Sequence, residues 1–373
     1  MAKTRKKDDA YWMGLALGEA VKARGHTSPN PMVGAVLVKD GKLLAKGYHR
    51  RAGLPHAEIE AMRRAKDLKD ATLYVTLEPC CHEGKRTPPC TGAILGSGIR
   101  KVVIGTLDPN PKVSGKGAKI LKRAGIKVEV GVLEEDCRQI NVFYNHWIRG
   151  GTPWVLLKVA SSLDGRIALA NGKSRWITGE HARHWVHRLR NEVDAVLVGI
   201  GTAQADDPAL TARHKSAARQ PIRIVLDPKF QISPRAKVFD PSIGAPAWLL
   251  VEPKFQNSRK RSILEKRGHE VIAAPLKKNG RVDLKKLLAL LGKKGVLSLL
   301  VEGGPGVWTE FLQQKAFQEL WAFVAPKLLG AEARPMFLKL GLKRLDEQSA
   351  LKLSDVEVLG DDVLLVYRSS LVN

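Results

Sequence analysis

The sequence is divided near its middle by a short break, Arg149-Gly-Gly-Thr-Pro153. Two adjacent glycines and a proline end a helix or a strand. On both sides of the break, apolar segments of strand length alternate with helical ones, which is typical of layered α/β sheets. A chain of 373 residues also exceeds the usual size of one hydrophobic core. We therefore expect a flexible basic N-terminus at residues 1–9, α/β domains at 10–149 and 153–373, and a linker at 150–152.

The first half begins with a predicted helix and a predicted hairpin. Apolar residues at helical spacing predict a helix over residues 10–24, and an apolar run predicts a strand over 32–38. Asp40-Gly41 favours a tight turn into a second strand over 43–48. The other strands are expected at 72–77, 101–105 and 126–130, and the other helices from about 56, from about 89, at 116–124 and at 134–148.

The second half starts a new series of strands and helices directly after the break. No G-x-G-x-x-G motif follows a strand, so the sequence does not support a Rossmann dinucleotide site. Strands are expected at 154–160, 195–199, 222–226, 247–251 and 297–301, and a helix at 180–190. We find no internal repeat, and both halves are interpreted as α/β domains.

The formal net charge is +25, from 62 Lys and Arg against 37 Asp and Glu. Such a charge attracts phosphate-bearing ligands and can also bind nucleic acid without specificity. The basic residues are spread along the chain, so we interpret them as a solvated surface that helps to attract anionic substrates, with no specific nucleic-acid partner. No apolar run approaches the roughly 18 residues that span a membrane, and the start lacks the pattern of a secretory signal. We expect no membrane association and a cytoplasmic location.

Three of the four cysteines, Cys80, Cys81 and Cys90, lie within eleven residues of one another. In a reducing compartment, clustered cysteines are more typical of metal sites than of disulfides. A catalytic zinc needs three protein ligands and an open position, and one His with two Cys suits zinc. His56 is the candidate histidine, and Glu58 follows it closely enough to carry a proton, as in zinc deaminases. A structural zinc remains the alternative, with Cys81 or His82 as its fourth ligand.

The spacing between the candidate ligands resembles one family of deaminases. Cys90 follows Cys80 by ten residues, and Pro29-Asn-Pro-Met-Val-Gly34 lies upstream. These segments, with Glu78-Pro-Cys80, His82, Gly84 and Thr87-Pro-Pro-Cys90, resemble the diaminohydroxyphosphoribosylaminopyrimidine deaminases of riboflavin synthesis. The resemblance implies His56, Cys80 and Cys90 as zinc ligands, Glu58 as the proton carrier, and Asn30 and His82 in the pyrimidine pocket. The loop carries one residue more than the commonest family form, around Lys85-Arg86, so Cys81 competes with Cys80 as ligand; Glu78-Pro79 favours Cys80.

Two features of the second half indicate a ligand site. The strand at 297–301 ends in Glu302-Gly-Gly-Pro-Gly306, where glycines would let backbone amides approach a phosphate. An ordinary glycine-rich turn is the alternative. Lys158 lies inside an apolar run, and the alternative there is a strand lysine that faces solvent.

The order of motifs in the second half resembles the ribosylaminouracil-phosphate reductases, which have a dihydrofolate-reductase-like fold. The motifs are Leu157-Lys-Val-Ala-Ser-Ser-Leu-Asp-Gly-Arg166, Trp176-Ile-Thr178, Gly201-Thr202, Ala205-Asp-Asp-Pro-Ala-Leu210 and Val301-Glu-Gly-Gly-Pro305. The resemblance implies NADPH contacts at Ala160, Trp176, Thr202, Asp206, Gly304, Pro305 and Gly306. It implies substrate contacts at Lys158, Ser174, Arg190, Leu210, Arg213 and Glu302. Lys158 and Asp206 are the candidates for assisting ring opening or proton transfer.

The two resemblances together imply a bifunctional enzyme of riboflavin synthesis, with a three-layer cytidine-deaminase-like domain before the reductase. We expect zinc-dependent deamination of 2,5-diamino-6-ribosylamino-4(3H)-pyrimidinone 5′-phosphate, followed by NADPH-dependent reduction of the ribose to ribityl. The expected partners are this phosphorylated pyrimidine, one Zn²⁺ per chain, NADPH and further copies of the chain in a homo-oligomer. The alternatives are a nucleoside or tRNA base deaminase with an accessory domain, and a basic nucleic-acid-binding protein with structural zinc.

Overall fold

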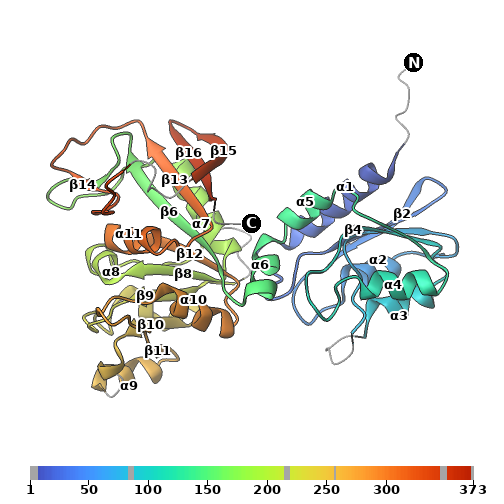
Figure 1. Cartoon of the computed structure of the whole chain (residues 1–373), viewed down its shortest axis with the longest axis horizontal. Helices are drawn as coiled ribbons and strands as arrows, with labels where there is room; N and C mark the ends of the chain where they lie inside the picture. Colours follow the sequence, from blue (N-terminus) through green and yellow to red (C-terminus); the bar gives the residue numbers. More distant parts are fainter. Residues whose placement is uncertain (1–6, 83–87, 214–218, 256–257, 345–350, 371–373) are drawn as a thin grey trace. The chain divides into compact units, whose positions relative to one another are not determined.

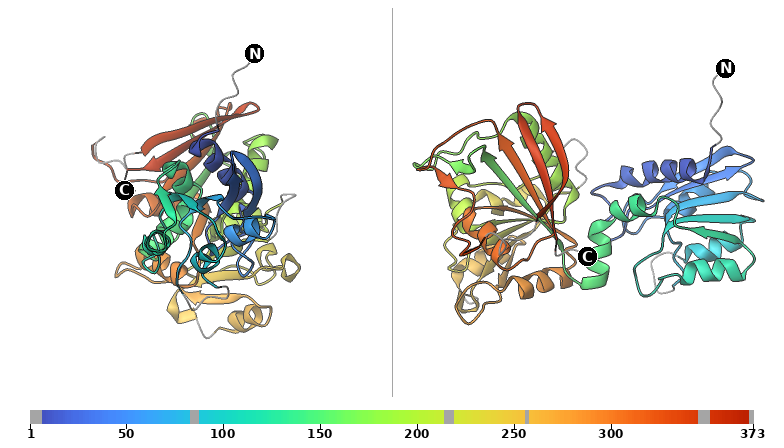
Figure 2. Two further views of the ribbon diagram at one scale, coloured as in Figure 1. Left: turned by 90° about the vertical axis from the view of Figure 1, so that its right-hand side faces the viewer. Right: turned by 45° about the horizontal axis from the view of Figure 1, so that its top comes forward.

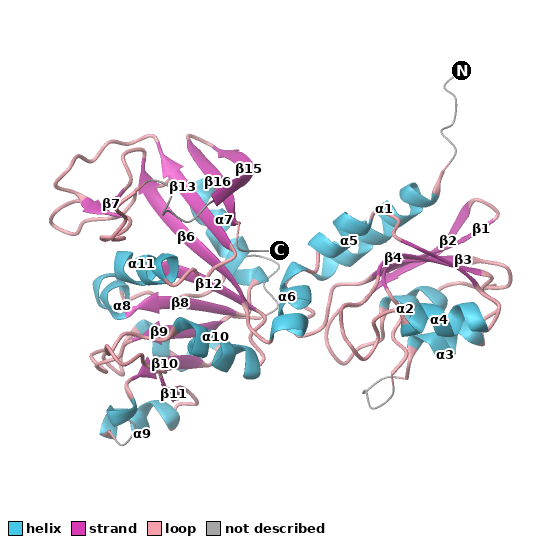
Figure 3. Cartoon of the chain, viewed as in Figure 1, coloured by secondary structure: helices cyan, strands magenta, loops and turns pink. Residues whose placement is uncertain are grey.

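The computed structural model describes residues 7–82, 88–213, 219–255, 258–344 and 351–370, and the chain forms two compact units (Figure 1). The units are Met1–Gly151 and Thr152–Asn373. Each unit is built around its own sheet, with helices on the sheet's faces (Figure 3). Among the described residues, no helix is both long enough and apolar enough to span a membrane.

The first unit contains a five-stranded sheet in the order β2-β1-β3-β4-β5. Strands β1 and β2 form the hairpin expected at Asp40-Gly41, where φ is 50° and 70°. Strand β1 is antiparallel to β3, and β3, β4 and β5 are parallel. The strands are β1 (Gly34–Lys39), β2 (Lys42–Tyr48), β3 (Thr72–Leu77), β4 (Lys101–Thr106) and β5 (Lys127–Val130).

Helices cover both faces of this sheet, which gives three layers (Figure 2). Alternate residues of β1 face opposite layers: Leu37 packs in the core beneath α2, α3 and α4, and Val36 packs with Trp12 and Met13 of α1. Cys137 of α5 is fully buried in that second core, and burial raises its pKa to about 12, as suits an inert thiol. The helices are α1 (Asp9–Ala20), α2 (Ala57–Met62), α3 (Cys90–Leu95), α4 (Lys116–Arg123), α5 (Glu134–Gln139) and α6 (Val142–Gly150).

Two predicted helices differ from the observed ones. The helix expected over 134–148 is broken into α5 and α6 at Asn141, whose side chain accepts from the Met32 N–H at 2.7 Å and donates to the Met32 carbonyl at 2.8 Å. The helix expected over 10–24 ends as an α-helix at Ala20 and continues as a short 3₁₀ turn. At the end of α6, Gly150 still belongs to the helix, and Gly151 terminates it with φ of 65°.

The second unit contains a nine-stranded sheet in the order β11-β10-β9-β8-β12-β6-β13-β16-β15. The strands from β11 to β13 are parallel, and β16 and β15 add an antiparallel hairpin at one edge. A separate small ribbon pairs β7 with β14. The strands are β6 (Trp154–Ser162), β7 (Arg166–Ala168), β8 (Ala195–Gly199), β9 (Ile222–Leu226), β10 (Ala247–Val251), β11 (Glu270–Ala273), β12 (Ser298–Gly303), β13 (Glu319–Ala325), β14 (Arg334–Pro335), β15 (Leu351–Leu359) and β16 (Asp362–Ser369).

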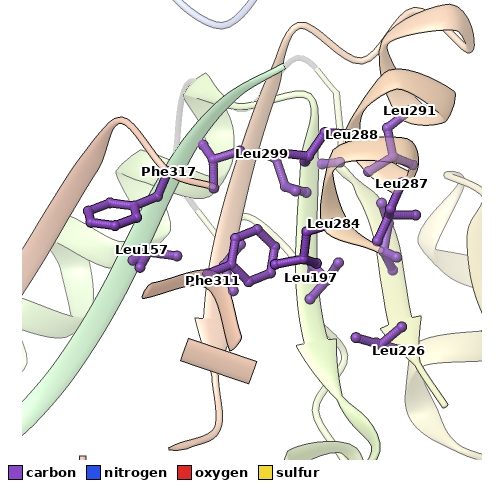
Figure 4. Close-up of a cluster of buried hydrophobic side chains, with 14 of the residues drawn as sticks. Leu157, Leu197, Leu226, Leu284, Leu287, Leu288, Leu291, Leu299, Phe311 and Phe317 are labelled. Carbon is purple, nitrogen blue, oxygen red and sulfur yellow. The ribbon is translucent and has the colours of Figure 1, made fainter. Parts of the chain in front are cut away.

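A hydrophobic core of the second unit lies between this sheet and helices α10 and α11 (Figure 4). Leucines at helical spacing on α10, including Leu284, Leu288 and Leu291, meet Leu197 of β8 and Leu299 of β12. This packing fixes the adjacent strands β6, β12 and β8, whose carboxyl ends carry the candidate reductase residues. The helices are α7 (Glu180–Glu192), α8 (Ile200–Asp206), α9 (Arg259–Glu265), α10 (Leu284–Lys293) and α11 (Pro305–Gln313).

Candidate functional site

Three metal donors meet in the first unit where secondary structure elements begin or end. His56 is the N-cap of α2, Cys80 follows β3, and Cys90 is the first residue of α3. Their ligand atoms all lie within 4.8 Å of one another. His56 Nδ1 is 3.2 Å from Cys90 Sγ and 3.5 Å from Cys80 Sγ. In a tetrahedral zinc site, nitrogen and sulfur ligands lie about 3.5 Å apart, so these residues fit zinc.

The two thiols of this group are buried and electrostatically coupled. Hydrogen bonds from the Cys90 thiol and from His56 lower the pKa of Cys80, whereas the bond to Cys80 and burial raise the pKa of Cys90. Their contact therefore shifts the pKa values of the two thiols in opposite directions. Zinc binds cysteine as thiolate, and its charge would favour that form of both side chains.

Cys81 and His82 do not belong to this group of donors. Both are half-buried, and the extra loop residue around Lys85-Arg86 lies outside the described residues. Among the residues that the structure describes, the Cys80 alternative is therefore the one that brings three donors together. Three protein donors are the number that a catalytic zinc takes, with a fourth position for water.

Glu58 is the second residue of α2, two positions after His56, and is only 3% exposed. Burial raises the pKa of its carboxyl group, with the charge of His56 acting in the opposite direction. A carboxyl group with a raised pKa can both accept and release a proton near neutral pH. Glu58 is thus suited to proton transfer beside the metal donors.

A cavity of about 340 Å³ is lined by Glu58 and by two of the donors, His56 and Cys80. Asn30 and His82, predicted for the pyrimidine pocket, both line it. Sequence reasoning missed His49, which is 2% exposed and lies with Nε2 3.0 Å from Nδ2 of Asn30. It also missed Tyr144, which donates to Asp108 at 3.1 Å on the cavity wall. No sequence motif marks these contacts, because they join segments far apart in the chain.

Glu78 holds the loop after β4 against the metal-binding segment. Its carboxylate accepts backbone N–H bonds from Asp108 at 3.2 Å, Gly115 at 2.8 Å and Ala118 at 3.1 Å. Sequence analysis used Glu78 only to align Cys80. The three bonds give it a physical function in shaping the cavity that Asp108 lines.

In the second unit, the candidate residues gather at the carboxyl ends of parallel strands. The register pairs Val301 of β12 with Leu157 of β6, so that Glu302 and Lys158 follow on neighbouring strands. Burial lowers the pKa of Lys158, and the charge of Glu302 partly offsets this effect. The alternative of a solvent-facing strand lysine does not fit this environment. Ala160, two residues further along β6, is half-buried.

The glycine loop after β12 is closely packed. Gly303 has φ of 104°, and a Cβ there would overlap the indole ring of Trp308. A Cβ on Gly304 would lie 3.0 Å from Thr202 Oγ1 on α8, so the two predicted NADPH segments are neighbours. Gly304 also caps the N-terminus of α11 without a side-chain bond, and the N-terminus of a helix favours a phosphate. Pro305 and Gly306 begin that helix. The loop is therefore compatible with a dinucleotide phosphate.

Arg190 of α7 forms a two-point ion pair with Glu302. Its Nε and Nη2 atoms lie 2.6 and 2.8 Å from the two carboxylate oxygens, and Nη1 donates to the Thr211 carbonyl at 3.0 Å. Arg213 is exposed, and its guanidinium contacts His187 of α7. Sequence reasoning missed His187 and Thr211, which link the two predicted arginines.

The remaining predicted positions lie around the outer rim of the site. Trp176 is 61% exposed and is covered on one face by Arg183, 4.5 Å from the ring centroid. Arg175 donates to the carbonyl of Asp206 at 3.0 Å, which connects this loop with the end of α8. Ser174 is half-buried, and Leu210 is buried with φ of 54°.

Comparisons with known proteins match a family model to each half of the chain. A family model described as the RibD C-terminal domain matches residues 153–365, and one described as the cytidine and deoxycytidylate deaminase zinc-binding region matches residues 6–106. The riboflavin biosynthesis protein RibD of Aquifex aeolicus is 43% identical over 361 residues, which cover 96% of this chain and 98% of that protein. The protein of the same name from Escherichia coli K12 is 40% identical over 370 residues, with 96% and 98% coverage.

Solved structures match nearly the whole length of the chain. Acinetobacter baumannii RibD, form 1, superposes with a TM-score of 0.88 at 39% identity, covering 98% of this chain and 100% of that one. A Thermotoga maritima diaminohydroxyphosphoribosylaminopyrimidine deaminase/5-amino-6-(5-phosphoribosylamino)uracil reductase gives 0.86 at 37% identity, with 97% and 98% coverage. The expected cytidine-deaminase-like and dihydrofolate-reductase-like folds are confirmed by these matches. With near-complete coverage in both sequence and structure, the chain belongs to the RibD family of riboflavin biosynthesis proteins.

Proposed function

We propose that the chain carries both activities named for its Thermotoga relative, a diaminohydroxyphosphoribosylaminopyrimidine deaminase and a 5-amino-6-(5-phosphoribosylamino)uracil reductase. The first reaction exchanges the 2-amino group of the pyrimidine for an oxygen from water and releases ammonia. The second reduces the ribose of the resulting uracil to ribityl. The observation that carries the proposal is the meeting of three zinc donors near the buried Glu58, with Glu58, His56 and Cys80 on the wall of a cavity of about 340 Å³.

In the deaminase unit, His56, Cys80 and Cys90 would hold the zinc ion. Zinc in such a site supplies an activated water at neutral pH. Glu58 accepts a proton from the water side of the reaction and donates one to the departing amine, which its raised pKa favours. Asn30 and His82 orient the pyrimidine, since both line the cavity.

In the reductase unit, NADPH would lie along the carboxyl ends of β6, β8 and β12 and supply a hydride to C1′ of the ring-opened ribose. Its expected contacts are Ala160, Trp176, Thr202, Asp206 and the loop from Gly304 to Gly306. The close approach of Gly304 to Thr202 supports this assignment, because a side chain at Gly304 would fill the space between them.

The substrate of the reductase would bind beside these segments. Arg213 is exposed and positively charged, as suits a ligand for the 5′-phosphate. Arg190 already donates to Glu302 and Thr211, so it contributes to phosphate binding with its other N–H groups. Lys158 and Glu302 would contact the ribose, with Ser174 and Leu210 beside them. Because burial lowers its pKa, Lys158 gives up a proton more readily than an exposed lysine, and Asp206 is the second candidate for assisting ring opening.

The charge and the cysteines of the chain also bear on its substrates and its location in the cell. Small phosphorylated pyrimidines are the substrates, and the excess of basic charge attracts them without a specific nucleic-acid site. We infer a cytoplasmic location, since thiols that bind zinc stay reduced there. A homo-oligomer remains a prediction.

The purified full-length chain tests the proposal directly. Given the phosphoribosyl diaminopyrimidine, it should release ammonia, and addition of NADPH should then lead to NADPH oxidation. Chelation of zinc should stop the first step only. Salt-sensitive RNA or DNA binding without ammonia release would instead support a nucleic-acid-binding protein with structural zinc.

A further inference from the structure

The Arg213 guanidinium contacts a histidine, His187, that has no assigned function in either proposed reaction. Nε2 of His187 lies 3.2 Å from Nε and 3.0 Å from Nη2 of Arg213, and Nδ1 of His187 lies 3.1 Å from the carbonyl oxygen of Thr211. A guanidinium only donates and a carbonyl only accepts. The backbone nitrogen of Arg213 also lies 3.3 Å from His187 Nδ1, which is longer than the 3.1 Å from Nδ1 to the Thr211 oxygen. The neutral tautomer with the proton on Nδ1 and a lone pair on Nε2 satisfies the Thr211 carbonyl and the Arg213 guanidinium, and it leaves the longer backbone contact without a hydrogen bond.

The surroundings of His187 keep it in this neutral form. It is half-buried on α7, and burial together with the charges of Arg190 and Arg213 lowers its pKa to about 4. The Thr211 carbonyl accepts from both His187 and Arg190, and Arg190 is itself fixed by Glu302. Arg213 is therefore the exposed end of a continuous chain of hydrogen bonds that starts at Glu302.

An exposed arginine normally samples many rotamers, and binding a ligand then requires that this freedom be lost. His187 engages one edge of the Arg213 guanidinium, through Nε and Nη2. The N–H groups not directed at His187 stay available to an anion, and a planar guanidinium recognises phosphate oxygens through two parallel bonds.

We propose that His187 is a positioning residue of the reductase, whose neutral imidazole orients the Arg213 guanidinium to bind the 5′-phosphate of the substrate. The inference rests on the proposed function, in which Arg213 contacts that phosphate. It adds a residue that sets affinity for phosphorylated over unphosphorylated substrates and does not itself contact them.

The test uses the full-length chain and steady-state reduction of 5-amino-6-(5-phosphoribosylamino)uracil. His187→Phe keeps a flat ring but removes both nitrogens, and it should raise the KM for this substrate roughly ten-fold, the lower range for losing a hydrogen bond to a charged group. The kcat and the KM for NADPH should stay within about two-fold, since the change acts on phosphate binding. His187→Gln, which returns an acceptor near the Nε2 position, should restore most of the affinity.

Two controls separate positioning from general damage. His184 lies on the same helix, is 70% exposed at its side chain and forms an ion pair with the equally exposed Glu180, so His184→Phe should leave the KM unchanged. The corresponding substrate without its phosphate should show no difference between His187→Phe and the parent enzyme. If His187→Phe does not fold, His187→Asn carries the same test, because its shorter amide can donate to the Thr211 carbonyl but does not reach the Arg213 guanidinium.

The double variant decides between outcomes. His187→Phe combined with Arg213→Ala should be no worse than Arg213→Ala alone, because both changes remove the same interaction. The inference would be overturned if the two substitutions raised the KM by factors that multiply in the double variant, or if His187→Phe raised the KM equally for the phosphorylated and unphosphorylated substrates. Arg213 would then remain as the phosphate ligand. If Arg213→Ala does not change the KM for the phosphorylated substrate, the phosphate assignment of the proposed function fails, and the inference fails with it.

Discussion

Arg190 and Glu302 form a two-point ion pair, at 2.6 and 2.8 Å, between helix α7 and the carboxyl end of strand β12. Their side chains are 14% and 9% exposed, so little water screens the pair. Glu302 also partly offsets the effect of burial on the pKa of Lys158. The pair therefore connects a helix, a strand and a candidate catalytic lysine, which gives it a structural as well as a functional effect.

Replacing Glu302 should destabilise the second unit in a pH-dependent way. Glu302→Gln leaves the Arg190 charge buried without its partner, which costs about 3–5 kcal/mol. Because Arg190 holds the pKa of Glu302 below its ordinary value despite burial, the pair stabilises the fold at every pH above the unfolded-state pKa, about 4.3. That contribution is lost only as the pH falls through the lower folded-state pKa. Urea unfolding should show a difference in the free energy of unfolding between the parent chain and Glu302→Gln that is constant near neutral pH and becomes smaller in strong acid. A difference that does not depend on pH would contradict the contribution of the ion pair.

The second prediction concerns the identity of the zinc ligands. The parent chain should contain about one zinc, and Cys80→Ser should lose both zinc and deamination. Cys81→Ser is the matched control, since Cys81 is adjacent but lies outside the donor group, and it should keep both properties. Metal analysis and ammonia release on the two variants provide the measurement. The reverse pattern would move the ligand to Cys81 and shift the alignment based on Glu78.

The third prediction separates proton transfer from metal binding at Glu58. Glu58→Gln preserves shape but cannot carry a proton, so deamination should fall by roughly 10²–10⁴-fold while zinc content stays the same. The reductase step, assayed with already deaminated substrate, is the internal control and should be unaffected. Loss of zinc from this variant would make Glu58 a ligand and contradict the assigned acid–base function.

Sequence reasoning succeeded where the signal is local. Strands β3, β8, β9 and β10 match their predicted ranges residue by residue, because each is a short apolar run with clear boundaries. The candidate zinc donors were found for a similar reason, since each lies at the junction between elements that a motif marks. The reductase positions required the family resemblance, because no single motif identifies them.

The misses share a different cause, which is contact between distant segments. Asn141 breaks the helix expected over 134–148 because it pairs with Met32, 109 positions away. Glu78 contacts a loop 30 to 40 residues further along the chain, and His187 meets Arg213 26 residues later. A side chain gives no sign in its local pattern that it will meet a partner so remote.

The fourth prediction concerns the glycine loop after β12. Gly303→Ala would place a methyl group against the Trp308 indole at φ of 104°, so it should lower the unfolding temperature and reduce NADPH oxidation. Deamination should continue, since the first unit has separate cores. Gly201→Ala is the control for stability, because a Cβ there meets nothing within 4 Å. Equal unfolding temperatures for the two variants would show that the loop can relax around the methyl group.

The fifth prediction is that each of the two units folds and catalyses its reaction without the other. The core beneath α10 and α11 and all of the candidate reductase residues follow residue 152, and the zinc donors and the cavity beside them lie before it. A chain comprising residues 153–373 should therefore fold alone and oxidise NADPH when given 5-amino-6-(5-phosphoribosylamino)uracil. The rate of NADPH oxidation should not change with a zinc chelator, whereas the chelator should stop ammonia release by residues 1–151.

In the fragment of residues 153–373, Asp206→Asn should reduce turnover more than it lowers the unfolding temperature, because half-buried Asp206 ends the short helix α8 and has little core to support. Zinc dependence of NADPH oxidation would contradict the separation of the two sites, and full turnover by Asp206→Asn would leave Lys158 as the remaining candidate for assisting ring opening.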